Sequence, residues 1–74
     1  MSPRSPRLNA RGIERVLQRH GFVLVSQKGS HRKWACEASG AQVIVPFHGG
    51  KDLPIGTLRQ IMKASEVAAD KWVE

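Results

Sequence analysis

The tetrapeptide Lys28-Gly29-Ser30-His31 places a histidine directly after a Gly-Ser pair, a combination typical of a tight turn. Imidazole titrates close to neutral pH, so His31 can take up or release a proton without being buried. Cleavage of RNA without a metal ion needs such a group. A base must remove the 2′-hydroxyl proton, an acid must protonate the leaving 5′-oxygen, and cations must hold the phosphate. His31 is therefore a candidate base for a reaction at a phosphodiester.

The residues beside His31 suit a phosphate. Lys28, Arg32 and Lys33 supply positive charge, and the amides around Gly29 can approach an anion because glycine has no side chain. Along an extended strand, His31 and Lys33 point to one face and Arg32 points to the other. The simpler interpretation is an ordinary hairpin turn followed by a solvated strand residue. The Gly-Ser-His tripeptide taken alone favours that interpretation.

Two more histidines allow several interpretations. His48 lies in a segment with two glycines and no periodicity, which indicates a loop. It can be the acid opposite His31, a group that stacks on bases or binds phosphate, or a loop histidine with no role. His20 precedes a glycine that can end a helix, where a protonated imidazole interacts favourably with the helix dipole. We expect a capping role for His20.

The remaining candidates have common structural explanations. Trp34 and Trp72 can stack on bases, but a tryptophan in a strand or a terminal helix is more often part of the core. Arg59 faces either the ligand side of the sheet or water. The histidines are far apart in sequence and form no HExxH or Cys-His pattern, so we expect neither a metal site nor a cofactor.

Composition limits the class of protein. With 74 residues the chain forms one domain, and its net charge of +6 with a pI near 10.5 favours a polyanion or an acidic partner, although basic residues also serve solubility. Cys36 is the only cysteine, which excludes an internal disulfide and a thiolate zinc site. No segment resembles a secretory signal or approaches the roughly 20 apolar residues of a membrane span. We expect a cytoplasmic protein.

The order of elements follows from periodicity and turn residues. We expect residues 1–8 to form a flexible basic tail and residues 9–74 to form the domain, although Leu8 fits the apolar stripe of the first helix. Asn9 and Gly21 bound that helix, and Ser65 caps a short closing helix. Strands are predicted at 22–27, 31–37 and 42–45, a loop at 47–52, and a helix from Pro54 to Met62. The predicted fold is α+β, in the order α-β-β-β-α, with both helices on one face of a three-stranded antiparallel sheet.

Four motifs in this order and spacing resemble the HicA family of toxin–antitoxin mRNA interferases: Gly21-Phe22, Lys28-Gly29-Ser30-His31, Val45-Pro46-x-His48 and Gly56-Thr57-Leu58-Arg59-x-Ile61. The resemblance extends over most of the chain. It implies a double-stranded-RNA-binding-like fold, metal-independent cleavage of RNA, and neutralisation by a cognate HicB-type antitoxin. It places the catalytic histidine at His31, against the simpler interpretation of the tripeptide. Phe47 departs from the pattern, since a basic residue is common there.

The leading hypothesis is an endoribonuclease that cleaves mRNA and blocks translation. His31 transfers the proton, and the residues expected to bind the substrate are Lys28, Gly29, Ser30, Lys33, His48, Lys51 and Arg59. Two other classes remain open: a non-catalytic RNA-binding module of the same fold, and a protein that only binds an acidic partner. The first would bind RNA without cutting it, and the second would bind its partner without affinity for RNA.

Overall fold

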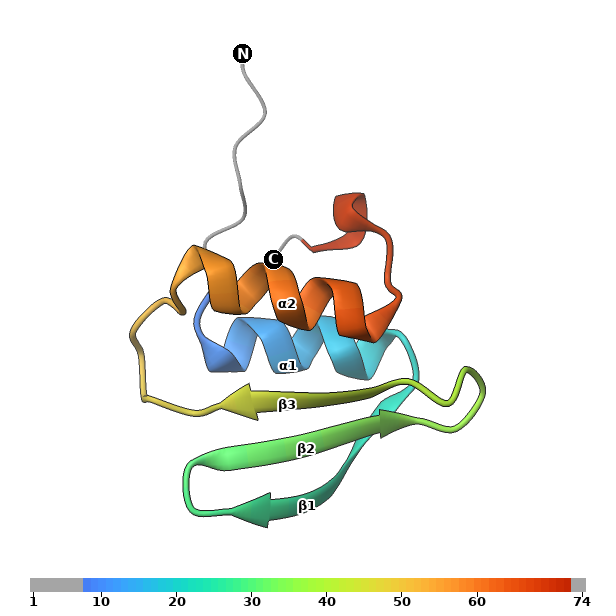
Figure 1. Ribbon diagram of the computed structural model, residues 1–74, viewed down its shortest axis with the longest axis horizontal. Coiled ribbons are helices and arrows are strands. Elements are labelled where there is room, and N and C mark those ends of the chain that lie inside the picture. The colour runs from blue at the N-terminus through green and yellow to red at the C-terminus, as the bar shows by residue number, and fades with distance from the viewer. Residues whose placement is uncertain (1–7, 73–74) are drawn as a thin grey trace.

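The computed structural model describes residues 8–72, and residues 1–7 of the tail predicted at 1–8 lie outside that range. The chain forms α1 (Ala10–Arg19), β1 (Phe22–Lys28), β2 (His31–Cys36), β3 (Gln42–Pro46), α2 (Ile55–Ser65) and a 3₁₀ helix, η1 (Ala69–Lys71). The predicted α-β-β-β-α order is confirmed (Figure 1). Both helices begin at the end of the molecule where β2 begins and β3 ends.

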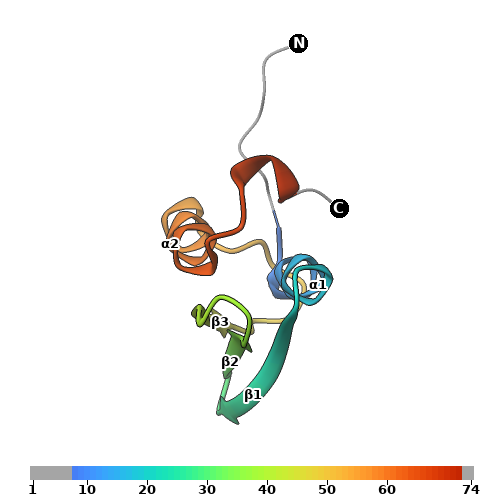
Figure 2. The same ribbon diagram turned by 90° about the vertical axis from the view of Figure 1, so that its right-hand side faces the viewer.

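The three strands form one antiparallel sheet in the order β1-β2-β3, so β2 is central. Both helices lie on one side of the sheet, and the other side is uncovered (Figure 2). Burial follows this arrangement. Val45 on β3 is fully buried and its partner on β2 is Arg32, whereas Ile44 is 56% exposed and its partner is Lys33. The sheet therefore has a core face toward the helices and an open face.

α1 begins where its sequence predicts. The side chain of Asn9 accepts a hydrogen bond from the Gly12 amide at 2.9 Å, which satisfies one of the free N–H groups of the first turn. Gly21 has a φ of +87°, a left-handed conformation that lets the chain leave the helix. Leu8, which the tail prediction included, is buried, as its place in the apolar stripe predicts.

The core lies between the helices and the sheet. Its buried apolar residues are Leu8, Ala10, Ile13, Val16, Leu17, Phe22, Trp34, Cys36, Ala41, Val43, Val45, Leu53, Leu58, Ile61 and Trp72. In β1 only Phe22 is buried, and a register shift between Leu24 and Ser26 adds one residue to that strand. Val23 and Val25 are more than half exposed. The apolar composition of β1 therefore predicts the strand but not its burial.

The chain after α2 differs from the prediction at Ser65. Ser65 is the last residue of α2, and its hydroxyl donates to the Met62 carbonyl and accepts from the Val67 amide. Glu66 has a φ of +62°, so it turns the chain away from the helix. The closing helix is consequently a single 3₁₀ turn, and Trp72 after it is buried. Within residues 8–72, no helix is long and apolar enough to cross a membrane.

Candidate functional site

His31 is the first residue of β2 and is exposed to solvent. Its partner across the β1–β2 hairpin is Lys28, and Gly29 and Ser30 form the turn between them. Gly29 has a φ of +59°, which glycine adopts readily and L side chains rarely do, and no atom lies within 4 Å of a Cβ placed there. The turn therefore holds His31 exposed at one end of the sheet.

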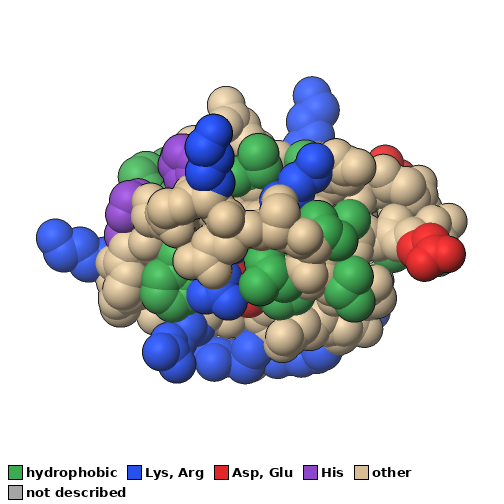
Figure 3. Space-filling view, turned by 90° about the horizontal axis from the view of Figure 1, so that it is seen from below, with side chains coloured by type: hydrophobic (Ala, Val, Ile, Leu, Met, Phe, Trp, Pro, Cys, Tyr) green, Lys and Arg blue, Asp and Glu red, His purple; other side chains and the backbone are tan. Residues whose placement is uncertain are grey.

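The loop that carries His48 is joined to this turn. His31 pairs with Pro46 at the end of β3, and the next amide, that of Phe47, donates a hydrogen bond to the Ser30 carbonyl at 2.7 Å. His48 follows directly and is exposed. Two segments that are distant in sequence, each with an exposed histidine, thus meet at one end of the sheet. Figure 3 shows histidine side chains together with Lys and Arg side chains at that end.

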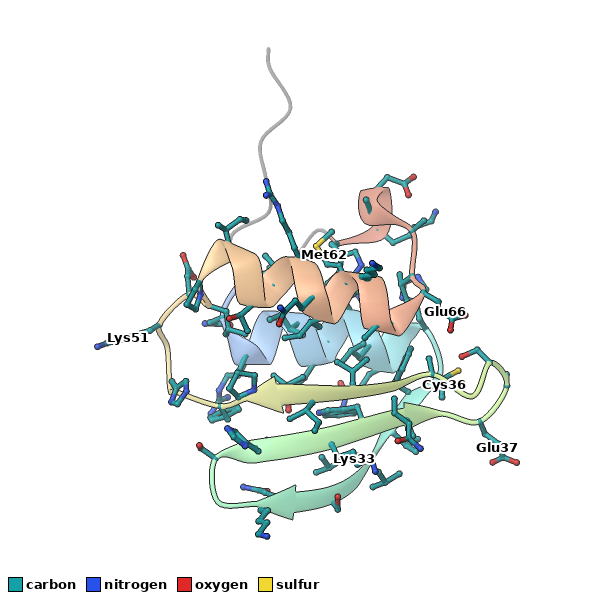
Figure 4. All side chains as sticks on the ribbon, viewed as in Figure 1. Lys33, Cys36, Glu37, Lys51, Met62 and Glu66 are labelled. Atoms are coloured by element: carbon teal, nitrogen blue, oxygen red, sulfur yellow. The ribbon has the colours of Figure 1, made fainter. Side chains whose placement is uncertain are left out.

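The predicted cations occupy different positions around this end. Lys28 and Lys33 lie on β1 and β2, the two strands that the turn connects. Lys33 shares the open face of the sheet with His31 because one residue separates them along β2. Lys51 lies in the loop after His48 and points away from the molecule (Figure 4). Arg59 is exposed on α2, and within residues 8–72 no hydrogen bond or ion pair links it to the turn. The three lysines therefore lie on the strands and the loop at this end, and Arg59 lies on α2, which begins there.

The backbone adds positive potential at the same end. Both α1 and α2 begin there, and neither has an acidic residue in its first turn. Unpaired N–H groups at a helix start carry partial positive charge that favours anions. Pro54, which precedes α2, provides no side-chain cap. Among the acidic residues, Asp52 lies at this end, where it forms a bridge with Asn9, and Glu37 and Glu66 lie at the opposite end of the molecule (Figure 4).

Arg32 and Glu14 form an interaction that sequence reasoning missed. Arg32 lies on the core face of the sheet, and its Nε is 3.1 Å from Oε2 of Glu14 on α1. The same oxygen accepts a hydrogen bond from the Trp34 indole at 2.8 Å. The signal was present, because Glu14 lies one turn from Ala10 and from Leu17 on the buried face of the helix. Arg32 is therefore held inside the fold and does not join Lys33 on the open face.

The other aromatic and histidine predictions resolve in favour of structural roles. Trp34 and Trp72 are 3% and 1% exposed, so neither presents a ring on which a base can stack. The indole of Trp72 donates to the Val67 carbonyl at 3.3 Å. Nδ1 of His20 lies 2.9 Å from the Val16 carbonyl, and it donates because a carbonyl can only accept. His20 is the C-cap residue of α1, as predicted.

Cys36 lies at the end of β2 away from His31 (Figure 4). It is buried, and a hydrogen bond from the Ser39 side chain lowers the pKa of its thiol while burial acts in the opposite direction. The hollow beside Cys36, of about 340 Å³, is lined in part by His20, Phe22 and Val67, and neither His31 nor His48 lines it. Within residues 8–72 no group of three or more His, Cys, Asp or Glu side chains could hold a metal ion.

The fold and the site define a small two-layer α+β protein with an exposed histidine at a basic end. A family model of the HicA toxin of bacterial toxin–antitoxin systems matches residues 10–67, well over half of the chain. The chain belongs to the HicA toxin family. A comparison with curated proteins gave no match.

Proposed function

We propose that this HicA-family toxin is an endoribonuclease that cleaves mRNA without a metal ion and uses His31 for proton transfer. The observation that carries the proposal is the junction of the His31 turn with the His48 loop through the hydrogen bond from the Phe47 amide to the Ser30 carbonyl. This junction places two exposed imidazoles on neighbouring segments. General acid–base cleavage of a phosphodiester needs two proton-transfer groups on the two sides of the phosphate.

The proposed roles follow from position. His31 removes the 2′-hydroxyl proton, and Lys28, Ser30 and the Gly29 amide hold the phosphate at the turn. Lys33 extends this positive surface over the open face of the sheet, which suits the backbone of a nucleic acid. His48 either protonates the leaving 5′-oxygen or binds the substrate beside it.

Lys51 and Arg59 extend the proposed RNA surface beyond the turn. Lys51 points into solvent from the loop after His48. Arg59 is exposed on α2 one turn after the start of that helix, where the helix dipole also favours an anion. We assign both residues to electrostatic contacts with RNA, away from the reacting phosphate.

We also propose that the protein is neutralised by a HicB-type antitoxin that covers the open face. That face and the adjacent edge strand expose apolar side chains as well as cations: Val23 is 59% and Ile44 is 56% exposed. Exposed apolar residues rimmed by charge are typical of a protein interface. An acidic partner would complement the cations around His31 and exclude RNA from it.

Growth of bacteria that express the toxin without its antitoxin tests the role of His31. We expect the His31→Ala variant to accumulate and to leave growth unaffected, because the proton-transfer group is missing. The His20→Gln variant is the matched control, since it changes the histidine at the C-terminal end of α1, away from the His31 turn. Growth arrest by His31→Ala at the level of the unchanged protein would contradict the proposal.

The alternative function is a non-catalytic RNA-binding module, which the same basic end would serve. It predicts RNA binding with steep salt dependence and no cleavage by the unchanged protein. His31→Ala would then reduce affinity modestly, as the loss of any single polar contact does. RNA left intact by the unchanged protein would favour this alternative.

A further inference from the structure

Arg32 follows His31 directly but lies on the other side of the sheet. Its strand neighbour Val45 is fully buried, and its guanidinium group lies beside Glu14. The Arg32 side chain is 26% exposed and that of Glu14 is 10% exposed, so water screens the pair only in part. Arg32 Nε is shut off from solvent and is not aligned for a hydrogen bond, so charge attraction is what holds it to the carboxylate. Arg32 is thereby anchored to α1.

The other side of the guanidinium contacts the His48 loop. The Arg32 Cζ atom lies 4.9 Å from the centre of the Phe47 ring, within the range of a cation–π interaction. Phe47 is only partly buried against the core. Its amide makes the hydrogen bond to the Ser30 carbonyl, and His48 is the next residue. A chain of contacts therefore runs from Glu14 through Arg32 to the segment that carries His48.

We propose that Arg32 is a positioning residue, which holds Phe47 and His48 against the turn that carries His31. After His48 the loop continues through two glycines to Gly50, whose carbonyl accepts a hydrogen bond from the Asn9 side chain at 3.5 Å. Between the Ser30 hydrogen bond and that attachment, the Phe47 side chain is the anchor nearest to His48. Arg32 supports this anchor because the planar guanidinium covers the ring face while its charge stays with Glu14. The expected effect on RNA cleavage rests on the proposed function, whereas the positioning itself does not.

Hydrogen exchange of backbone amides in the free protein measures the positioning directly. In Arg32→Gln we expect protection of the Phe47 amide to fall about tenfold, the size of effect expected from a partly desolvated cation–π contact. Protection of the Cys36 amide, which bonds the Ala41 carbonyl at the other end of the sheet, should stay within twofold of the unchanged protein. Lys33→Gln is the control, since it removes a charge from the open face.

A second variant keeps the test valid if Arg32→Gln unfolds by leaving Glu14 unpaired. Phe47→Leu preserves the ion pair and an apolar side chain against the core but removes the ring face. We expect the same selective loss of protection at the Phe47 amide. Arg32→Lys should restore part of it, because an ammonium also interacts with a ring but lacks the planar face.

RNA cleavage provides the functional readout under conditions in which each variant is folded by circular dichroism. We expect kcat to fall about tenfold or more in Arg32→Gln and Phe47→Leu, with partial recovery in Arg32→Lys, because misplacement of a reacting group lowers the rate. Unchanged protection of the Phe47 amide in both variants would overturn the proposal. If the unchanged protein fails to cut RNA, the proposed function is wrong, and amide protection still decides whether Arg32 positions the loop.

Discussion

Glu14 places a carboxylate on the buried face of α1, and its Oε2 atom contacts two groups from β2. The indole of the buried Trp34 donates a hydrogen bond to it at 2.8 Å, and the half-buried Arg32 forms an ion pair with it. A buried polar group stabilises a fold when its partners are present and destabilises it when one is removed. The carboxylate therefore ties α1 to the strand that begins at His31.

Replacing Glu14 tests this link. We expect Glu14→Ala to lower the free energy of unfolding by about 2 kcal/mol, because the indole N–H loses its acceptor and the guanidinium loses its counter-charge. Glu14→Gln should lower it less, since the amide oxygen can still accept from Trp34. Urea unfolding followed by circular dichroism measures both. A loss for Glu14→Ala no larger than that for Glu37→Ala, an exposed acid in the β2–β3 turn, would contradict this account.

The residue scale also shows what a sequence can and cannot predict about the site. The turn and His31 could be predicted, because Gly-Ser punctuation and strand periodicity are local properties. The prediction that Arg32 and Lys33 point to opposite faces of the sheet, which follows from the alternation of side chains along a strand, is confirmed. The place of Glu14 on the buried face of α1 could be predicted, but its pairing with Arg32 could not, because the pairing depends on how α1 crosses the sheet. The catalytic role of His31 and the contacts of the substrate-binding residues stay predictions.

At the scale of elements, the β1–β2 and β2–β3 turns form a natural pair for comparison. Each contains a glycine with positive φ, Gly29 at +59° and Gly40 at +78°, and neither has an atom within 4 Å of an added Cβ. Their steric requirements are therefore alike. Only Gly29 lies beside the proposed phosphate position, so substitutions at the two glycines separate the stability of a turn from the binding of RNA.

We expect Gly29→Ala and Gly40→Ala each to lower stability by about 1 kcal/mol, because alanine is strained at positive φ. Asparagine tolerates that conformation better, so both Asn variants should stay closer to the unchanged protein. RNA cleavage should fall in Gly29→Asn, where a side chain blocks approach of the phosphate, and persist in Gly40→Asn. Full cleavage by Gly29→Asn would show that Gly29 serves the turn alone.

The elements themselves could be predicted from local signals, and the exceptions have physical causes. The Asn9 cap and the strand positions are confirmed. The shift of register in β1 escaped prediction because a bulge changes pairing and leaves composition unchanged. The prediction that Ser65 caps a closing helix was wrong. Ser65 is the last residue of α2, and that helix ends because Glu66 adopts a positive φ, which is rare for a residue with a side chain.

At the scale of the whole molecule, the antiparallel directions of the three strands bring the segments of the candidate site to one end of the sheet. β1 ends and β2 begins at the same end as the close of β3 and the starts of both helices (Figure 1). Each of these segments could be predicted singly from the sequence. The antiparallel topology predicts that these segments lie at the same end of the sheet. It does not predict the hydrogen bond from the Phe47 amide to the Ser30 carbonyl, because that bond depends on the register of β3. The result is a basic end and an end with Glu37 and Glu66.

This distribution of charge predicts the salt dependence of RNA binding. In the His31→Ala background, which we expect to leave RNA intact, Lys28→Gln and Lys51→Gln should each reduce the slope of log affinity against log salt by roughly 0.7 for a single-stranded RNA. Lys71→Gln removes a charge from η1, away from the turn, and should leave the slope unchanged. Equal reductions by all three variants would show that RNA is attracted by net charge alone.

The most direct test of the central claim is cleavage of a mixed mRNA by the purified protein in EDTA, with analysis of the ends of the products. We expect cutting by the unchanged protein and by His20→Gln, with 5′-hydroxyl ends because the 5′-oxygen leaves in this reaction. His31→Ala, folded by circular dichroism, should not cut. Cutting by His31→Ala at the rate of the unchanged protein, or loss of all cutting in EDTA, would contradict the account.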